Sequence, residues 1–156
     1  LPYTAGTNTT YLAVTPSSLS YSLTYNYDSI GGDFEFSVLG FCVPKISVFG
    51  QYLYNYGSAK DTAFLAGLGF GGDKIERLGQ WQVKYSFRML ERDSWLDTFP
   101  DSEAYSGRTG VRGHRLGAVC GLGRKISLAA AYSVFQMLTG ATNEHKLFIT
   151  DLNVSF

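Results

Sequence analysis

The chain has 156 residues, and 13 Lys plus Arg are balanced by 13 Asp plus Glu, so its formal net charge is zero. A nucleic-acid-binding protein normally carries a basic excess that neutralises phosphates, and the balanced charge excludes that class. Charged residues make up 17% of the chain and aromatic residues 15%, which is a low charge content for a soluble domain. No run of 18 apolar residues occurs, which excludes a transmembrane helix.

Strict alternation of apolar and polar residues recurs along the chain and predicts β-strands, because successive side chains of a strand point to opposite faces. Residues 1–17 lack this pattern, and we expect an irregular segment or part of a further strand there. From residue 18 to residue 156 the alternation predicts one unit built of strands. The predicted strands are 18–27, 33–38, 46–55, 62–71, 81–89, 112–122, 126–137 and 145–156.

The connections between these strands differ in length between the two ends of the predicted sheet. Residues 40–44 and 122–125 contain the Gly or Pro residues that tight turns require, and 71–79 is intermediate. At the other end lie 28–32, 56–60, 91–110 and 138–144, of which 91–110 is the longest. The pattern therefore predicts an all-β fold of about eight antiparallel, up-and-down strands and no helix.

The size of the side chains on each face favours a membrane barrel over a soluble one. On the strand 81–89, Trp81, Tyr85 and Phe87 share a face with two further large residues, and such bulk would overfill the interior of an eight-stranded barrel. The opposite faces are rich in Gly, Ala and Ser. We therefore expect a transmembrane β-barrel, which has to close because backbone groups in lipid must be paired.

Aromatic residues near the strand ends are typical of the girdles that lie at the two membrane interfaces. The predicted girdle residues are Tyr25, Tyr27, Tyr52, Tyr54, Trp81 and Phe156. A soluble barrel stays open as an alternative, because large apolar residues also occur on the otherwise polar face. These residues are Phe49, Leu53, Leu65 and Phe135.

Two parts of the sequence resemble bacterial outer-membrane proteins. The ending Asn153-Val154-Ser155-Phe156 is similar to the terminal strand of outer-membrane barrels, whose last aromatic residue is read by the barrel assembly machinery. Residues 81–88 (WQVKYSFR), an acidic loop with the sequence DSE at 101–103, and residues 107–114 (GRTGVRGH) resemble the C-terminal half of the putative porin family of Gram-negative bacteria. The resemblance covers residues 62–156.

This resemblance implies an outer-membrane porin, or the C-terminal part of one, through which small hydrophilic solutes and ions diffuse passively. Since such porins have more strands than this chain, it also implies either a fragment or a smaller relative. The implied partners are outer-membrane lipid, the solutes, and the assembly machinery acting through Phe156. With Phe156 on the periplasmic side, the connection 91–110 lies outside the cell, as this class requires.

Charged residues on the polar face are the candidates for lining a pore. Lys84 and Arg88 on one strand and Arg115 on its neighbour would form a basic ladder that points inward, while Glu35 and Asp151 supply acids on other strands. Alternatively, these cations only pair with Glu35 and Asp151 in a packed interior, since eight strands leave little room for water.

The long connection 91–110 is acidic and is the candidate constriction loop. Its acids are Glu91, Asp93, Asp97, Asp101 and Glu103. If the loop folds into the lumen, these acids would face the basic ladder and produce a transverse field that selects solutes by charge. The alternative is that the loop is a solvated surface.

Enzymatic function has little support, and we expect no enzyme, no cofactor and no metal. His114 and His145 fall near the predicted outer rim, where some small outer-membrane hydrolases use Ser and His, but no GxSxG motif accompanies them. Cys42 and Cys120 lack metal-ligand spacing. Besides a porin, the sequence allows a structural or interaction barrel that anchors or sheathes a plug or partner protein in the outer membrane.

Overall fold

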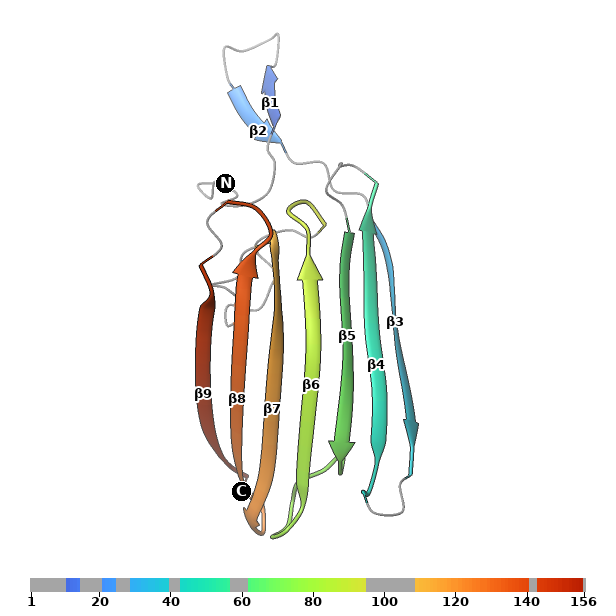
Figure 1. Ribbon diagram of the computed structural model, residues 1–156, viewed down its shortest axis with the longest axis vertical. Coiled ribbons are helices and arrows are strands. Elements are labelled where there is room, and N and C mark those ends of the chain that lie inside the picture. The colour runs from blue at the N-terminus through green and yellow to red at the C-terminus, as the bar shows by residue number, and fades with distance from the viewer. Residues whose placement is uncertain are drawn as a thin grey trace.

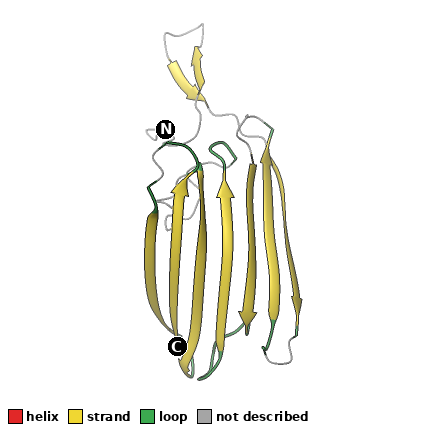
Figure 2. Cartoon of the chain, viewed as in Figure 1, coloured by secondary structure: helices red, strands yellow, loops and turns green. Residues whose placement is uncertain are grey.

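The computed structural model describes residues 11–14, 21–24, 29–39, 43–56, 62–94, 109–140 and 143–155. These residues form two antiparallel sheets (Figures 1 and 2). The smaller sheet pairs β1 (Tyr11–Val14) with β2 (Tyr21–Thr24). The larger sheet has seven strands, which are β3 (Ser29–Val38), β4 (Ile46–Asn55), β5 (Thr62–Gly71), β6 (Trp81–Leu90), β7 (Val111–Gly123), β8 (Ile126–Met137) and β9 (His145–Val154).

The seven strands are hydrogen-bonded in their sequence order, so the predicted up-and-down, all-β arrangement is confirmed. The strands predicted at 46–55, 62–71 and 126–137 coincide with β4, β5 and β8. The strand predicted at 81–89 is one residue shorter than β6, and the one at 112–122 is one residue shorter than β7 at each end. The described part of the chain contains no helix that could cross a membrane.

The prediction at the N-terminal end was partly wrong. Only Tyr21–Thr24 of the predicted strand 18–27 is described as a strand, and it pairs with β1 instead of joining the seven-stranded sheet. The strand predicted to start at residue 33, after a Gly31-Gly32 turn, begins at Ser29 and contains both glycines. A Cβ on Gly31 would lie 2.8 Å from the Cδ1 atom of Leu53, so the glycine leaves room for the side chain opposite it in β4.

One face of the large sheet is covered by large apolar side chains, and we call it the apolar face. A single row of paired residues crosses all seven strands on this face, and each member is at least 40% exposed. The row is Phe36, Val48, Leu68, Tyr85, Leu116, Tyr132 and Phe148. A continuous exposed apolar surface of this kind marks contact with lipid or with another protein.

The opposite face carries small and polar residues, and we call it the polar face. One of its rows is Ser37, Ser47, Gly69, Lys84, Gly117, Ala131 and Ile149. The large residues on this face lie over glycines of neighbouring strands: the ring of Phe49 lies over Gly67, and the ring of Phe135 lies over Gly113. These aromatic side chains therefore lie along the sheet, and this explains how large apolar residues fit among small ones on the polar face.

The large sheet is open, because β3 and β9 are its two edges and are not paired with one another in the described structure. Seven antiparallel strands necessarily give both edges the same direction. If β3 and β9 paired directly, they would form a parallel junction, whereas the up-and-down barrels of outer membranes are antiparallel throughout apart from rare exceptions. The sheet is thus part of a barrel wall, and an antiparallel closure needs an odd number of further strands between its edges.

The close packing of Phe49 over Gly67 predicts a stability difference between two glycines of the polar face. A Cβ on Gly67 would meet the Phe49 ring and would lie 2.6 Å from the backbone oxygen of Tyr85, whereas a Cβ on Gly117 would have only the Ala130 oxygen, at 4.0 Å, nearby. Gly67→Ala should therefore lower the free energy of unfolding by about 1–3 kcal/mol. Urea titration in detergent micelles measures it. Gly117→Ala is the control, with an expected change within about 0.5 kcal/mol; equal losses in the two variants would contradict the packing described.

Candidate pore-lining site

Three cations form a staircase along β6 and β7 on the polar face. Lys84 lies opposite Gly117, Arg88 lies opposite Gly113, and Arg115 lies opposite Ser86. Arg115 is the diagonal neighbour of both Lys84 and Arg88, and diagonal neighbours are about 7–8 Å apart. No side chain packs over Gly117, opposite Lys84, whereas the Phe135 ring fills the space above Gly113, opposite Arg88. The structure therefore brings together the three residues of the predicted basic ladder.

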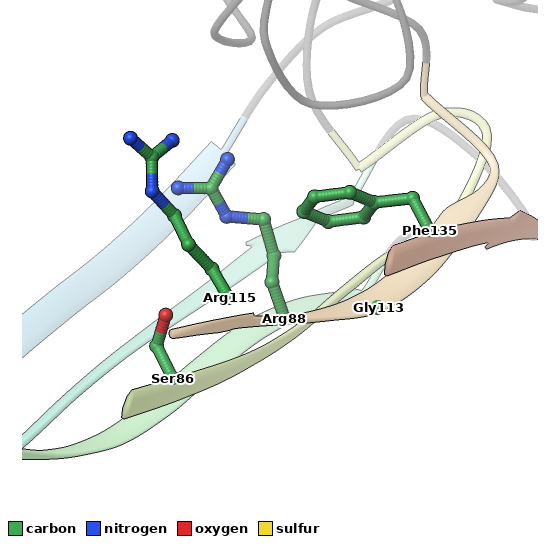
Figure 3. Close-up of a pocket in the computed structure, with 5 residues that line it drawn as sticks. All are labelled: Ser86, Arg88, Gly113, Arg115 and Phe135. Carbon is green, nitrogen blue, oxygen red and sulfur yellow. The ribbon is translucent and has the colours of Figure 1, made fainter. Parts of the chain in front are cut away.

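A pocket lies at the part of the staircase that is nearer the long connection. It is lined by Ser86, Arg88, Gly113, Arg115 and Phe135. Figure 3 shows Arg88 and Arg115 projecting from the same side of the sheet, with the ring of Phe135 beside Arg88. Phe135 is only 3% exposed, while Arg88 and Arg115 are half-buried. The pocket thus combines two guanidinium groups and a hydroxyl group with a buried aromatic wall.

The two predicted acids of the wall lie away from this staircase. Glu35 is on β3 and Asp151 is on β9, each three strands from β6, which corresponds to about 14 Å along the sheet. Both are exposed on the polar face. The open sheet therefore does not bring either acid beside Lys84 or Arg88.

Glu35 instead belongs to an ion cluster at the tight-turn end of the sheet. The Lys45 Nζ atom lies 3.7 Å from Glu35 and donates to both carboxylate oxygens of Asp73, at 2.9 and 3.0 Å. The hydrogen bond to Asp73, together with the charges of Asp73 and Glu35, raises the pKa of Lys45 above 10.5. A raised pKa means that this contribution to stability is present at neutral pH and is lost only as the pH rises through that raised value.

The first residues of the long connection are fixed to the strands beside them. The backbone N–H of Glu91 donates to the Thr62 oxygen, and the Thr62 N–H donates to the Glu91 carboxylate at 3.0 Å. The Asn55 side chain, at the end of β4, donates to the Asp93 backbone oxygen at 2.6 Å. Asn55 is fully buried and Asp93 is 2% exposed. Glu91 and Asp93 therefore lie in an ordered stem of the predicted constriction loop.

The last residues of the same connection complete this stem. The Thr109 hydroxyl group donates to the Arg92 backbone oxygen at 2.7 Å, and the Leu138 N–H donates to the Gly110 oxygen. Thr109 and Ser94 are fully buried. Both ends of the connection thus meet at one place between β4, β5 and β8. The other predicted acids of the loop, Asp97, Asp101 and Glu103, lie outside the described residues.

The predicted girdle residues are described only in part. Tyr52 is exposed near the long-connection end of β4, and the Tyr54 ring packs edge-to-face against Tyr56 with their centroids 5.1 Å apart. Trp81 is exposed at the opposite end of the sheet, at the start of β6. Aromatic residues therefore lie at both ends of the described strands. Tyr25, Tyr27 and Phe156 lie outside the described side chains.

The two histidines lie on opposite faces of the sheet. His114 is on the apolar face, where its Nδ1 atom shares a 2.7 Å hydrogen bond with the Tyr85 hydroxyl group and its ring packs against Phe87. His145 is on the polar face opposite Phe135. Sequence analysis missed the Tyr85–His114 pair, because only the register of β6 and β7 makes these residues neighbours. In the described ranges no three His, Cys, Asp or Glu side chains gather as metal ligands would.

A comparison with protein families identifies the chain. The family model described as "Putative porin" matches residues 18–156, which include all seven strands of the large sheet. The chain belongs to the putative porin family. No curated protein matches it. Membership gives this porin a porin-like role in general and accords with a non-enzymatic channel and an outer-membrane location.

The buried stem predicts that Asn55 holds the connection 91–110 in place. Asn55→Ala removes the donor to the Asp93 oxygen and leaves that buried oxygen without this bond, which costs about 1–3 kcal/mol. The variant should unfold at a lower urea concentration, and a protease should cut it faster between residues 91 and 110. Asn153→Ala, an exposed asparagine on the polar face of β9, is the matched control and should match the wild type in both assays. Cleavage of Asn55→Ala at the wild-type rate would show that the bond does not hold the loop.

Proposed function

We propose that this porin lies in the outer membrane of a Gram-negative bacterium and lets small hydrophilic solutes and ions diffuse passively through a water-filled lumen. The polar face of the seven-stranded sheet lines the lumen in this proposal, and the apolar face contacts lipid. The observation that carries it is the exposed apolar row that crosses all seven strands in register. In water this row would be a large exposed apolar patch, and lipid removes that cost.

The lengths of the strands agree with a bilayer. A tilted strand needs about 9–11 residues to cross the hydrocarbon layer, and five of the seven strands have 10 residues. The aromatic residues Tyr52 and Trp81 lie near opposite ends of these strands, where the two membrane interfaces would be. Both properties support a wall whose apolar face contacts lipid along its height.

The chemistry of the polar face supports a lumen that favours anions. Lys84, Arg88 and Arg115 lie together on β6 and β7, and the wall acids Glu35 and Asp151 lie on the edge strands β3 and β9, three strands from β6 on either side. A surface of one charge inside a narrow channel raises the local concentration of counter-ions. The loop acids Asp97, Asp101 and Glu103 would face this staircase if the loop fills the lumen, and that placement is part of the proposal.

The alternative is a structural or interaction barrel that anchors or sheathes a plug or partner protein. It drew support from the large apolar residues on the polar face. In the structure Phe49, Leu53 and Leu65 are half-buried within the sheet itself, and Phe135 is buried. Less apolar surface is thus available to a partner than the sequence suggested, and the observations favour the porin. Assembly through Phe156 is part of the porin proposal as well.

The porin proposal predicts ion currents whose selectivity depends on the staircase. The purified protein, in the assembly that closes the barrel, should show stable conductance steps in a planar lipid bilayer and a preference for chloride over potassium. Reversing two charges in Lys84→Glu with Arg88→Glu should shift the permeability ratio towards potassium by about tenfold, because the lumen then concentrates cations. The reversal potential in a potassium chloride gradient measures this ratio.

Arg124→Glu is the control for the change in charge, because Arg124 is exposed in the turn between β7 and β8 and lies beyond the wall. It should leave the reversal potential within the wild-type range. A closed wild-type barrel that inserts but carries no current would refute the diffusion channel. Conductance with an unchanged reversal potential in the double variant would show that the staircase does not line the lumen.

A further inference from the structure

The pocket beside Phe135 has the chemistry of an oxyanion site. Its donors are the guanidinium groups of Arg88 and Arg115 and the hydroxyl group of Ser86. We propose that this pocket is a solute-binding site in the channel, and that it recognises a carboxylate or phosphate group on the solutes that cross. The inference rests on the proposed diffusion function and adds to it the class of solute.

The register places the three donors at the corners of a small triangle. Ser86 lies directly opposite Arg115, which corresponds to about 4.5–5.5 Å between their Cβ atoms. Arg88 lies two residues from Ser86 on the same strand and face, about 7 Å away. Figure 3 shows both arginine side chains rising from the same side of the sheet. An anion above Ser86 would therefore lie within reach of both guanidinium groups.

The type of cation in the pocket distinguishes an oxyanion from chloride. A guanidinium group presents N–H donors in a planar fork that matches two oxygens of a carboxylate or phosphate, whereas an ammonium group is a point charge without that geometry. The staircase has arginine at the two pocket positions and lysine at its far step, Lys84. Chloride is attracted by all three charges, but only an oxyanion has two oxygens that can accept the paired N–H donors of a guanidinium group.

Phe135, packed over Gly113, forms a buried apolar wall on one side of the pocket. The Phe135 ring lies across Gly113, in the place that a side chain at residue 113 would occupy, and it is 3% exposed. Figure 3 shows this ring beside the side chain of Arg88. A buried ring next to a guanidinium group limits its conformations and removes water from one side, which strengthens a charge-assisted hydrogen bond. Phe135 is thus a positioning residue for Arg88.

The position of the pocket along the wall suits a solute in transit. Arg88 lies near the long-connection end of β6. Arg115, on β7, lies further towards the tight-turn end, and Lys84 is the next step in that direction. An oxyanion leaving the two arginines would therefore meet another cation about 7–8 Å from Arg115. Weak binding at successive steps allows a solute to be recognised and still released.

The experiment compares oxyanions with chloride in the conducting full chain. Inorganic phosphate and acetate, added in separate series to a bilayer bathed in potassium chloride, should reduce the chloride current in a saturable way. Arg88→Lys with Arg115→Lys keeps both charges and removes both forks, so the half-blocking concentration should rise about tenfold. The preference for chloride over potassium should stay as in the wild type. The two arms show whether phosphate, carboxylate or both are recognised.

Arg112→Lys is the matched control, because Arg112 is on the apolar face and its guanidinium group donates to the Gln136 side chain. The chloride current of the Arg112→Lys variant should be blocked at the same phosphate and acetate concentrations as that of the wild type. The single variants Arg88→Lys and Arg115→Lys should give intermediate half-blocking concentrations and serve if the double variant does not fold. A conducting protein that is blocked equally with and without the forks, or by neither anion, overturns the oxyanion site and leaves the porin proposal intact. A closed barrel that inserts but never conducts overturns both.

Discussion

The pairing of backbone hydrogen-bonding groups is the constraint on which the rest of this structure depends. Inside a bilayer each unpaired N–H or C=O group costs several kcal/mol, so strands in lipid have to be paired with neighbours on both sides. The five inner strands, β4 to β8, meet this requirement on both sides and the edge strands β3 and β9 on one, through ladders that run almost without interruption, with one register shift near Gly121. The same ladders fix which residues share a face. The apolar row and the basic staircase therefore both result from one register, and a slip of one residue in any strand would exchange the faces of that strand.

This register also explains how the polar face can carry both large residues and long cations. Rings at Phe49 and Phe135 lie over glycines of the adjacent strands, and Lys84 and Arg88 lie opposite glycines as well. Glycine thus has two uses on the same face: it accommodates a flat ring along the sheet in one place and leaves space above a cation in another. Figure 3 shows the first use, since Gly113 lies under Phe135, and Arg88, opposite the same glycine, lies beside the ring. A site made in this way combines a buried wall with charged groups that can still reach a lumen.

The sequence predicted the wall well and the site only in part, and the difference has a physical reason. Period-two alternation depends on local order along the chain, so β4, β5 and β8 could be placed to the residue. Pairing between strands depends on contacts that alternation does not encode. For this reason the pairing of residues 21–24 with β1 was not predicted, and the stem bond between Asn55 and Asp93, 38 positions apart, had no signal in the sequence. The staircase was predictable because β6 and β7 are consecutive strands of opposite direction, whereas the contribution of Phe135 required knowledge of the register between β7 and β8.

The direction of the two edges limits how this wall can be completed. Because β3 and β9 run the same way, a second copy of the seven-stranded sheet does not help: in a ring whose copies all have the same orientation across the membrane, every junction between copies would be parallel. Turning one copy over would make the junctions antiparallel but would place its loops on the wrong side of the membrane. An antiparallel closure with one orientation therefore requires an odd number of further strands, and those next to β3 and β9 run opposite to them. Such strands would extend the polar face on both sides of β6 and β7, and the width they add determines how far the pocket of Arg88 and Arg115 lies from the opposite wall. The chemistry of the pocket thus belongs to the described strands, while under the proposed function the size of solute that would reach it depends on the strands that complete the barrel.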